Sequence, residues 1–564
     1  MRRLLSLFVT GTIISIFSGS VSGAFDTATV TVNVSSVIDT ISDRLYGENI
    51  AIWTDVINGS NTNFNNKMIY AGTKYYRWPG GSYGDLVAWD STQQGTYSWC
   101  VSYDSTLSML KKVGGIMQPI VNFSGYWGGV QHTHAQAVQK AAAWVKNYNI
   151  TRKLGAKYWE IGNEIFGSWE QGDTTGAAYG QLFCDFYTAM KAVDSTIKIG
   201  AVVTTPLETD YDQFSNNALG NMKSGGVIPD FLIIHEYPYG QLTSVSYQND
   251  TAVTGEWIDR IDSQVTTAKA WAKRYLGSAN FGKVEYFYTE FNADRENGSQ
   301  ESQFLNAMYI SQALMEFARL GVTGANPWCA DYYTTDGNPT WYVRPMFVYH
   351  YGKYVVNTSI GQSNIRTHAW AARDTLGNVT MFLANNSVAS SCIANIVLKG
   401  CNAGTAGEKW VIQGVGGSWQ PEFTSISMNG TTSPSASSIK TLSGQSFTSS
   451  TSFSVTLPAY SMTWLKIPVS NISKTLRREN VELSGKSINI RETGRGAFSV
   501  SIMGATVGHE AWTVNVYDFA GKSVYYNKGN GHEAFFKLEK AASGIYFCKI
   551  NYGEMNYTRA VVVK

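Results

Sequence analysis

Between residues 45 and 328 the chain repeats one pattern, in which a short apolar run ends in polar or glycine-rich residues. A stretch with apolar residues near helical spacing then follows. The eight apolar runs span residues 45–50, 74–78, 116–123, 157–162, 197–203, 230–237, 284–291 and 321–328. The clearest helical stretches span residues 134–153, 179–193, 257–276 and 302–320, whereas the first two spacers are only weakly helical. This alternation predicts an α/β fold, a (β/α)8 TIM barrel over residues 45–352.

The pattern changes after about residue 353 to short alternating runs without helix-length spacers. Such runs predict a C-terminal antiparallel β-sandwich over residues 353–468. An N-terminal segment, residues 25–44, carries a further alternating run that we expect to add a strand to this sandwich. A polar, partly basic linker is predicted at residues 469–484, and residues 485–564 are expected to form another small β-sandwich domain.

The first 24 residues have the features of a secretory signal peptide. Arg2 and Arg3 precede an apolar stretch, and small residues lead up to a predicted cleavage near Ala24. No later stretch is long enough to span a membrane. Export permits disulfides, and Cys392 and Cys401 could close a hairpin or remain free thiols. The six cysteines lack the spacing of a zinc or redox centre, so no metal site or cofactor is predicted.

Composition narrows the choice of ligand. The chain has 44 Lys and Arg against 42 Asp and Glu, for a net charge of +2, without a long basic run. A nucleic-acid binder would carry a basic footprint, so nucleic acid is not expected as a partner. The 17 Trp, 33 Tyr and 25 Phe suit either a large core or a neutral ligand met through ring faces, such as a sugar.

Two glutamates follow predicted strands at the end where barrel enzymes gather their polar groups. Glu164 lies in the segment KYWEIGNEIFGSWE, residues 157–170, and Glu290 closes the seventh predicted strand. Two carboxylates about 5 Å apart suit a retaining glycosidase, in which one protonates the leaving oxygen and the other attacks the anomeric carbon. The alternative is two unrelated glutamates that end strands. Glu160 is expected in the barrel interior and Glu170 in a loop.

Four motifs in this order resemble the clan-A glycoside hydrolases, most closely the family-51 α-L-arabinofuranosidases, with features of families 44 and 39. They are RWPGGSYGDLVAW (77–89), WEIGNE (159–164), HEYPYG (235–240) and TEFN (289–292). The resemblance covers about residues 28 to 468. It implies a retaining mechanism with Glu164 as general acid/base, Glu290 as nucleophile and Asn163 on the sugar hydroxyl beside the anomeric centre.

The resemblance also suggests supporting groups. Arg77 is expected to orient Glu290, Tyr237 to donate to it, and His235 to touch substrate. Glu48 and Asn49 match the position where arabinofuranosidases bind sugar hydroxyls. Three tryptophans are candidate sugar platforms, with core packing the alternative for each: Trp78, Trp127 and Trp328.

The substrate remains open at this stage. This chain has TEFNA in place of the DEW motif that commonly carries the family-51 nucleophile. TEFNA is closer to families 44 and 39, which weakens the case for arabinofuranosides. The expected function is hydrolysis of plant cell-wall polysaccharide or oligosaccharide, with α-L-arabinofuranosidase first. The alternatives are an endo-β-1,4-glucanase, xylanase or xyloglucanase on the same barrel and, less favoured, a non-catalytic surface carbohydrate-binding protein.

The last predicted domain resembles the C-terminal sorting domain of the type IX secretion pathway. The matching segments are VNVYDFAGKSVYY (514–526), ASGIYFCKI (542–550) and the terminal RAVVVK. The alternative is an ordinary terminal β-sandwich. The resemblance implies the type IX secretion machinery as a partner and a secreted or outer-surface location.

Overall fold

The computed structural model describes residues 26–54, 57–90, 100–207, 212–238, 253–294, 302–329, 337–362, 367–416, 419–472 and most of 487–563. The predicted signal peptide and most of the predicted linker lie outside these residues. The chain divides into two compact units, residues 1–474 and 475–564. In the described part of the chain, no helix combines the length and hydropathy that a membrane span requires.

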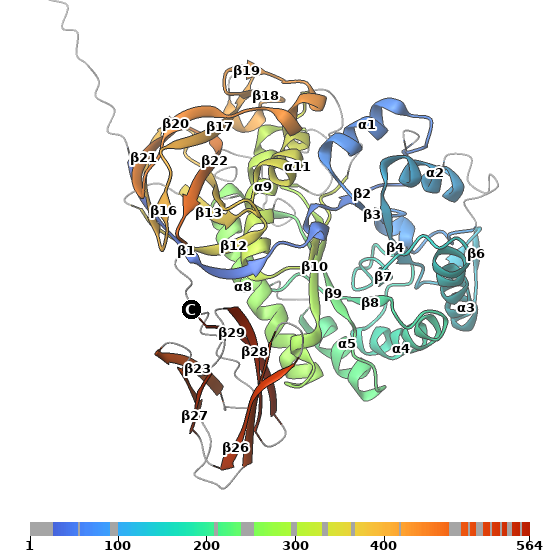
Figure 1. The fold of residues 1–564 in the computed structure, drawn as a ribbon. Helices are drawn as coiled ribbons and strands as arrows, with labels where there is room; N and C mark the ends of the chain where they lie inside the picture. The colour runs from blue at the N-terminus through green and yellow to red at the C-terminus, as the bar shows by residue number, and fades with distance from the viewer. Residues whose placement is uncertain are drawn as a thin grey trace, which may run out of the picture. The chain divides into compact units, whose positions relative to one another are not determined.

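A ring of parallel strands forms the centre of the first unit (Figure 1). Its eight strands follow one another in chain order, and backbone hydrogen bonds from Gly47 N to Ala325 O and from Asn49 N to Pro327 O join the last strand to the first. All eight fall inside the predicted runs, so the predicted barrel is confirmed. They are β2 (Glu48–Asn49), β3 (Tyr75–Trp78), β4 (Ile116–Val121), β7 (Tyr158–Ile161), β8 (Lys198–Val202), β9 (Phe231–Glu236), β10 (Glu285–Phe291) and β11 (Gly324–Ala325).

Helices lie between the strands along the chain and cover the outside of the barrel (Figure 1). Two of them, α1 (Thr62–Ala71) and α2 (Tyr103–Val113), form from the weakly helical spacers. The others are α3 (His134–Val145), α4 (Gly176–Val193), α5 (Asp212–Ser224), α8 (Glu256–Trp271), α9 (Phe304–Leu320) and α11 (Pro339–His350).

The barrel interior is layered. Near the amino ends of the strands, Phe287 packs against Tyr158 and Phe231, with ring centroids 4.8 and 4.7 Å apart. Glycines make room for these rings, because a Cβ added at Gly200 or Gly324 would come within 2.2 Å of Phe231 or Phe287. The layer nearer the carboxyl ends is polar, and it forms the floor of the site described below.

A large sheet forms the sandwich that follows the barrel (Figure 1). The N-terminal strand β1 (Asp26–Thr40) lies between two of its strands, antiparallel to β12 and parallel to β15. The remaining strands are β12 (Tyr354–Gln362), β13 (Thr367–Arg373), β14 (Asn378–Asn385), β15 (Cys392–Lys399), β16 (Asn402–Ala403), β17 (Ala406–Val415), β18 (Ser425–Met428), β19 (Thr431–Thr432), β20 (Gln445–Thr448), β21 (Ser452–Leu457) and β22 (Ser461–Ser470).

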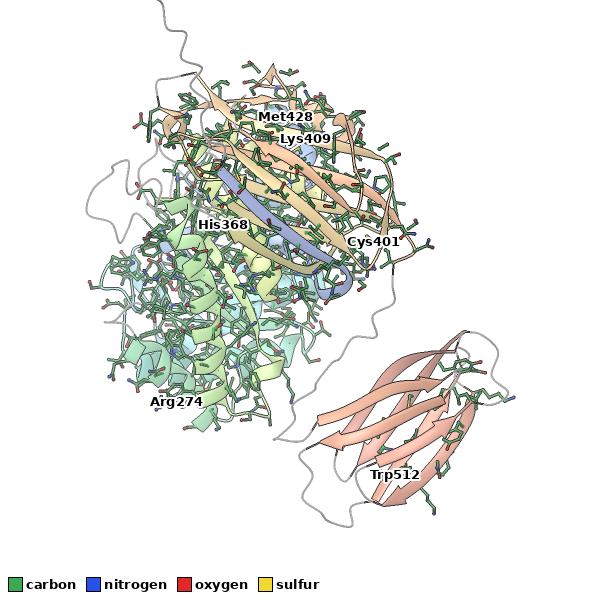
Figure 2. The ribbon with its side chains drawn as sticks, turned by 90° about the vertical axis from the view of Figure 1, so that its left-hand side faces the viewer. Arg274, His368, Cys401, Lys409, Met428 and Trp512 are labelled. Carbon is green, nitrogen blue, oxygen red and sulfur yellow. The ribbon has the colours of Figure 1, made fainter. Side chains whose placement is uncertain are left out.

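The possible disulfide between Cys392 and Cys401 is not formed, because both cysteines are free. Cys392 is buried among the apolar side chains of the sandwich core. Cys401 lies on the turn between β15 and β16 at one end of the sandwich (Figure 2).

The second unit consists of antiparallel strands in two sheets. One sheet has the order β23-β24-β27 and the other β26-β25-β28-β29. Trp512 begins the buried pattern of β25 in the larger sheet (Figure 2). The bounds are β23 (Ser487–Gly494), β24 (Ala497–Met503), β25 (Ala511–Tyr517), β26 (Ser523–Asn530), β27 (Glu533–Lys537), β28 (Gly544–Tyr552) and β29 (Met555–Val563).

Candidate active site

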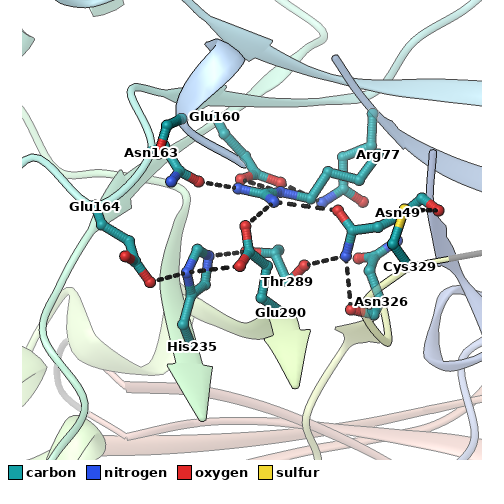
Figure 3. Close-up of polar contacts among 12 residues, drawn as sticks. Asn49, Arg77, Glu160, Asn163, Glu164, His235, Thr289, Glu290, Asn326 and Cys329 are labelled. Carbon is teal, nitrogen blue, oxygen red and sulfur yellow. Dashed lines mark hydrogen bonds and ion pairs between the residues drawn. The ribbon is translucent and has the colours of Figure 1, made fainter. Parts of the chain in front are cut away.

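Glu164 and Glu290 lie at the same end of the barrel, one in the loop after β7 and the other on β10 (Figure 3). One oxygen of each carboxylate and one ring nitrogen of His235 all lie within 4.8 Å of one another. The Glu290 side chain is 8% exposed and that of Glu164 is 21% exposed. The carboxylate on the strand is therefore the more enclosed of the two.

A break in the strand pairing turns Glu290 towards the barrel interior. Strict alternation would place Glu290 on the same face as Tyr288, whose ring stacks outside the barrel on Phe317 of α9. The pairing with β9 shifts between these two residues, so that Tyr288 faces Ile234 while Glu290 already faces His235. The extra residue of this bulge, Thr289, reverses the alternation.

Arg77 is the centre of the polar layer (Figure 3). Its side chain is fully buried and donates from Nη1 to Glu290 Oε1 at 2.6 Å and from Nε to Glu160 Oε2 at 2.9 Å. Nη1 also donates to Asn49 Oδ1 at 3.1 Å, and Nη2 donates to Asn163 Oδ1 at 2.8 Å. The planar guanidinium thereby fixes four side chains that come from three strands, β2, β7 and β10, or from the loop after β7.

Tyr237 and His235 complete the surroundings of the two carboxylates. The Tyr237 hydroxyl donates to Glu290 Oε2 at 2.8 Å. Burial and the charges of Glu290 and Glu164 raise the Tyr237 pKa well above its usual value, so this hydroxyl keeps its proton. His235 Nδ1 lies 2.8 Å from Glu164 Oε1, and Nε2 lies 3.1 Å from the Thr289 hydroxyl.

Glu164 and His235 each stabilise the charged form of the other. Burial raises the pKa of Glu164, but the hydrogen bond and charge of His235, with the Trp169 indole N–H, outweigh burial and lower it overall. Burial lowers the pKa of His235, whereas Glu290 and Glu164 together raise it further than burial lowers it. Glu164 and His235 therefore share one proton, and they release it at a higher pH than an ordinary histidine would.

Two residues expected to bind sugar lie behind the site instead. Glu48 is fully buried and forms an ion pair with Arg344 of α11, on the helix side of the barrel wall. Asn49 points inward, but its amide donates to the carbonyls of Thr289 at 2.7 Å and Asn326 at 2.9 Å, and its oxygen accepts from Arg77. In this arrangement Glu48 and Asn49 hold the barrel wall and the Arg77 cluster.

The three candidate platforms have different surroundings. Trp78 is 1% exposed and packs between Tyr103 and Trp144, so its expected role as a platform is wrong and it belongs to the core. Trp127 is half-buried and stacks on His132 with centroids 3.8 Å apart. Trp328 is half-buried, with its ring 5.8 Å from that of Trp53.

Sequence reasoning missed two contacts in the loop after β7. Trp169 is 53% exposed, and its indole N–H donates to Glu164 Oε2 at 2.7 Å. Glu170, expected as an ordinary loop residue, is 3% exposed and accepts from the Asn163 amide at 2.6 Å. The residue spacing within GNEIFGSWE carried no signal for either contact, because both depend on a turn from Gly167 to Glu170.

A metal ion is the other ligand that this cluster of side chains could hold. Among the described residues, the group close enough to coordinate one consists of Glu164, His235 and Glu290. Both oxygens of Glu290 are already bonded, one to Arg77 and the other to Tyr237. The buried guanidinium beside them opposes a second cation. The donor set therefore fits proton transfer better than metal binding.

Solved structures resemble the barrel and sandwich together. The α-L-arabinofuranosidase of Thermotoga maritima, solved with arabinose, gives a TM-score of 0.61 at 16% identity, covering 78% of this chain and 99% of that chain. The family-51 arabinofuranosidase of Xanthomonas axonopodis pv. citri gives the same TM-score and identity, over 78% and 100% of the two chains. The family-44 xyloglucanase of Paenibacillus polymyxa gives 0.56 at 13% identity, over 79% and 100%. These structures share the fold of a barrel followed by a sandwich with this chain.

The other comparisons concern sequence. Residues 494–564 match the family model described as a secretion system C-terminal sorting domain. Such a domain indicates export by type IX secretion, with release or attachment at the cell surface. A comparison with curated protein sequences found no match. The barrel and sandwich thus precede a domain that matches this family model and forms its own compact unit.

Proposed function

We propose that the protein is an exported retaining glycoside hydrolase of plant cell-wall polysaccharide. The observation that carries this proposal is the pair of carboxylates, with oxygens within 4.8 Å of each other and with different partners. Retaining enzymes hold their carboxyl groups about 5 to 5.5 Å apart, whereas inverting enzymes need room for a water between them. The close spacing favours retention of anomeric configuration.

Glu290 is the proposed nucleophile. Arg77 and Tyr237 each donate to one of its oxygens, which stabilises the carboxylate and aims it into the site. Its attack on the anomeric carbon forms a glycosyl ester while the bond to the leaving oxygen breaks. Water later adds to the same carbon and releases Glu290.

Glu164 is the proposed acid/base, acting with His235. In the first step the proton held by this pair passes through Glu164 to the leaving oxygen. In the second step Glu164 takes a proton from the attacking water, which restores the resting state of the pair. Its 21% exposed side chain is consistent with a group that exchanges protons in both half-reactions.

The first candidate substrate is an α-L-arabinofuranoside. The similarity in fold to arabinofuranosidases over both domains supports this choice. The ion pair between Glu48 and Arg344 counts against an arabinofuranoside substrate, because it keeps Glu48 away from the site. An exo-acting pocket needs polar groups around one terminal sugar.

An endo-acting β-1,4-glucanase, xylanase or xyloglucanase is the second candidate. Partly exposed aromatic rings follow strands around the barrel mouth: Trp53 and Tyr83 after β2 and β3, Trp127 and Trp169 after β4 and β7, and Trp328 after β11. In the closed ring of eight strands, the neighbours β11 and β2 lie opposite the neighbours β7 and β8. A polysaccharide crossing the mouth would meet rings on both sides of the carboxylates.

Two active-site substitutions test the mechanism. Glu164→Gln and Glu290→Ala should each lose orders of magnitude in kcat, and azide should rescue Glu290→Ala with inverted product stereochemistry. Glu285→Gln, at the amino end of the same strand β10, is the matched control and should retain activity. Wild-type-like turnover in both active-site variants would refute the assignment.

A substrate comparison separates the two candidates. Release from p-nitrophenyl α-L-arabinofuranoside is measured beside the viscosity of carboxymethylcellulose, glucomannan and xylan. Arabinose release without viscosity loss supports the first candidate, and rapid viscosity loss without aryl arabinofuranoside cleavage supports the second. Sugar binding without hydrolysis of any substrate would favour a carbohydrate-binding protein.

A further inference from the structure

Glu170 is a buried carboxyl group beside the candidate active site. The proposed reaction gives it no role. A backbone hydrogen bond from Glu170 N to Gly167 O, at 2.9 Å, closes the turn that directs Trp169 outward and Glu170 inward. The Glu170 Oε1 atom accepts two hydrogen bonds, from Asn163 Nδ2 at 2.6 Å and from the Ser82 hydroxyl at 2.7 Å. Glu170 thus joins the loops that follow β3 and β7.

Asn163 is held from three directions. Its backbone N–H donates to Asp85 Oδ2 at 2.7 Å, its side-chain oxygen accepts from Arg77, and its side-chain nitrogen donates to Glu170. A guanidinium only donates, so the amide oxygen must face Arg77 and the amide nitrogen must face Glu170. Among the residues that the structure describes, Glu170 is the partner of one amide N–H. The other N–H is then left for a substrate oxygen, and Glu170 sets its direction.

The surroundings of Asp85 and Glu170 indicate which of the two carries a proton. Asp85 accepts three backbone N–H bonds, from Asn163, Phe123 and Ser124, and these favour its charged form. Glu170 Oε2 is buried and has no hydrogen-bond partner among the residues that the structure describes. Leaving a charged oxygen in that state is costly, so the proton belongs on Glu170.

The electrostatics show that the pair of Asp85 and Glu170 keeps one proton near neutral pH, and the hydrogen-bond geometry, not the pKa shifts, assigns that proton to Glu170. Burial and the charge of Glu170 raise the pKa of Asp85 to about 8, against the opposing backbone hydrogen bonds. Burial likewise raises the pKa of Glu170, helped by the charges of Glu164 and Glu290. Two neighbouring acids in a buried space do not both ionise near neutral pH.

We propose that Glu170, as a neutral carboxyl group, positions the Asn163 amide for the hydroxyl on the sugar carbon next to the anomeric centre. Glu170 is a positioning residue, because it acts through Asn163 and does not touch the reacting atoms. The inference rests on the proposed glycosidase function and deepens it. It requires that the substrate carry a hydrogen-bond acceptor at that carbon.

The test compares Glu170→Ala and Glu170→Gln on an aryl glycoside that the wild type hydrolyses and on its 2-deoxy counterpart. Glu170→Ala should lose about tenfold or more in kcat/KM on the hydroxylated substrate and stay within about twofold of wild type on the 2-deoxy substrate. Glu170→Gln mimics the neutral acid and should stay near wild type on both. Adding Glu170→Ala to Asn163→Ala should cost nothing further, because the two act as one unit.

Several results would overturn the inference. An equal loss for Glu170→Ala on both substrates would indicate a merely structural role, and Glu170→Gln as impaired as Glu170→Ala would show that a charge is needed. Should Glu170→Ala not fold, Glu170→Asp, which withdraws the carboxyl by one methylene, serves in the same comparison. A wild type inactive on every glycoside would instead refute the proposed function itself.

Discussion

Replacing Arg77 by methionine should disable the site more than any other change outside the two carboxylates. The substitution keeps a long unbranched side chain but removes four side-chain hydrogen bonds. It also leaves Glu160 and Glu290 buried without the positive charge that neutralises them. Glu290 would then lack both the counter-charge and the hydrogen bond that hold its Oε1 atom in place for attack on the anomeric carbon.

The size of the effect follows from burial. Arg77 and Glu160 are fully buried and Glu290 is 8% exposed, so water screens their interaction little. Removing one partner of such a pair costs about 3 to 5 kcal/mol. If about 4 kcal/mol of this appears as lost stabilisation of the ionised nucleophile, kcat/KM should fall by roughly 10³. Arg77→Lys keeps the charge but lacks the planar fork, and its loss should be intermediate.

The assay combines kcat/KM on an aryl glycoside with urea unfolding of the same preparations. The control is Arg152→Met, beyond the end of α3, where Arg152 pairs with Asp104 and the two side chains are 36% and 59% exposed. This surface change should cost less than about 1 kcal/mol and leave kcat/KM unchanged. A folded Arg77→Met variant with kcat/KM within about threefold of wild type would refute the reasoning, since it would mean that Glu290 does not need its buried counter-charge.

Two further changes should move the alkaline limb of the kcat/KM profile in opposite directions. His235→Gln removes the group whose pKa is raised above its usual 6.5 by Glu290 and Glu164, so the proton must sit on Glu164 alone and the limb should shift to lower pH. Trp169→Phe removes a hydrogen bond that lowers the Glu164 pKa, so the pair should hold its proton more tightly and the limb should shift to higher pH. The measurement is kcat/KM as a function of pH for each purified variant. Shifts of the alkaline limb in the same direction would contradict a proton shared by Glu164 and His235.

The barrel could be predicted because its strands are buried on both faces and read as apolar runs between helical stretches. It was harder to predict which side chains of a short strand face the barrel interior. Glu48 and Asn49 are neighbours on β2 and pair with Tyr76 and Arg77 respectively. Since side chains alternate across a strand, Asn49 shares the inner face with Arg77, and Glu48 points out to α11. A two-residue strand gives too little pattern to assign these faces from sequence.

The position of Glu290 shows a different limit. Motif order predicted that it would end its strand, but the bulge at Thr289 that turns it inward has no signature in the run YFYTEF. Glu170 was missed for a related reason, since its contact with Asn163 depends on the path of one loop. Both features belong to backbone geometry, which apolar and polar periodicity does not encode.

The two carboxylates have different hydrogen-bond partners and different exposure. These differences favour Glu290 as the nucleophile and Glu164 as the acid/base over the opposite assignment. Glu290 stands on a strand, with one oxygen bonded to a permanent cation and the other to a hydroxyl that keeps its proton. A carboxylate that accepts a hydrogen bond on each oxygen is held in one orientation, as a nucleophile requires, but is badly placed to carry a proton to a leaving oxygen. Glu164 stands on a loop, is more exposed, and shares a proton with His235. If the roles were exchanged, the acid would have to be protonated against Arg77, and the nucleophile would lack a permanent counter-charge of its own.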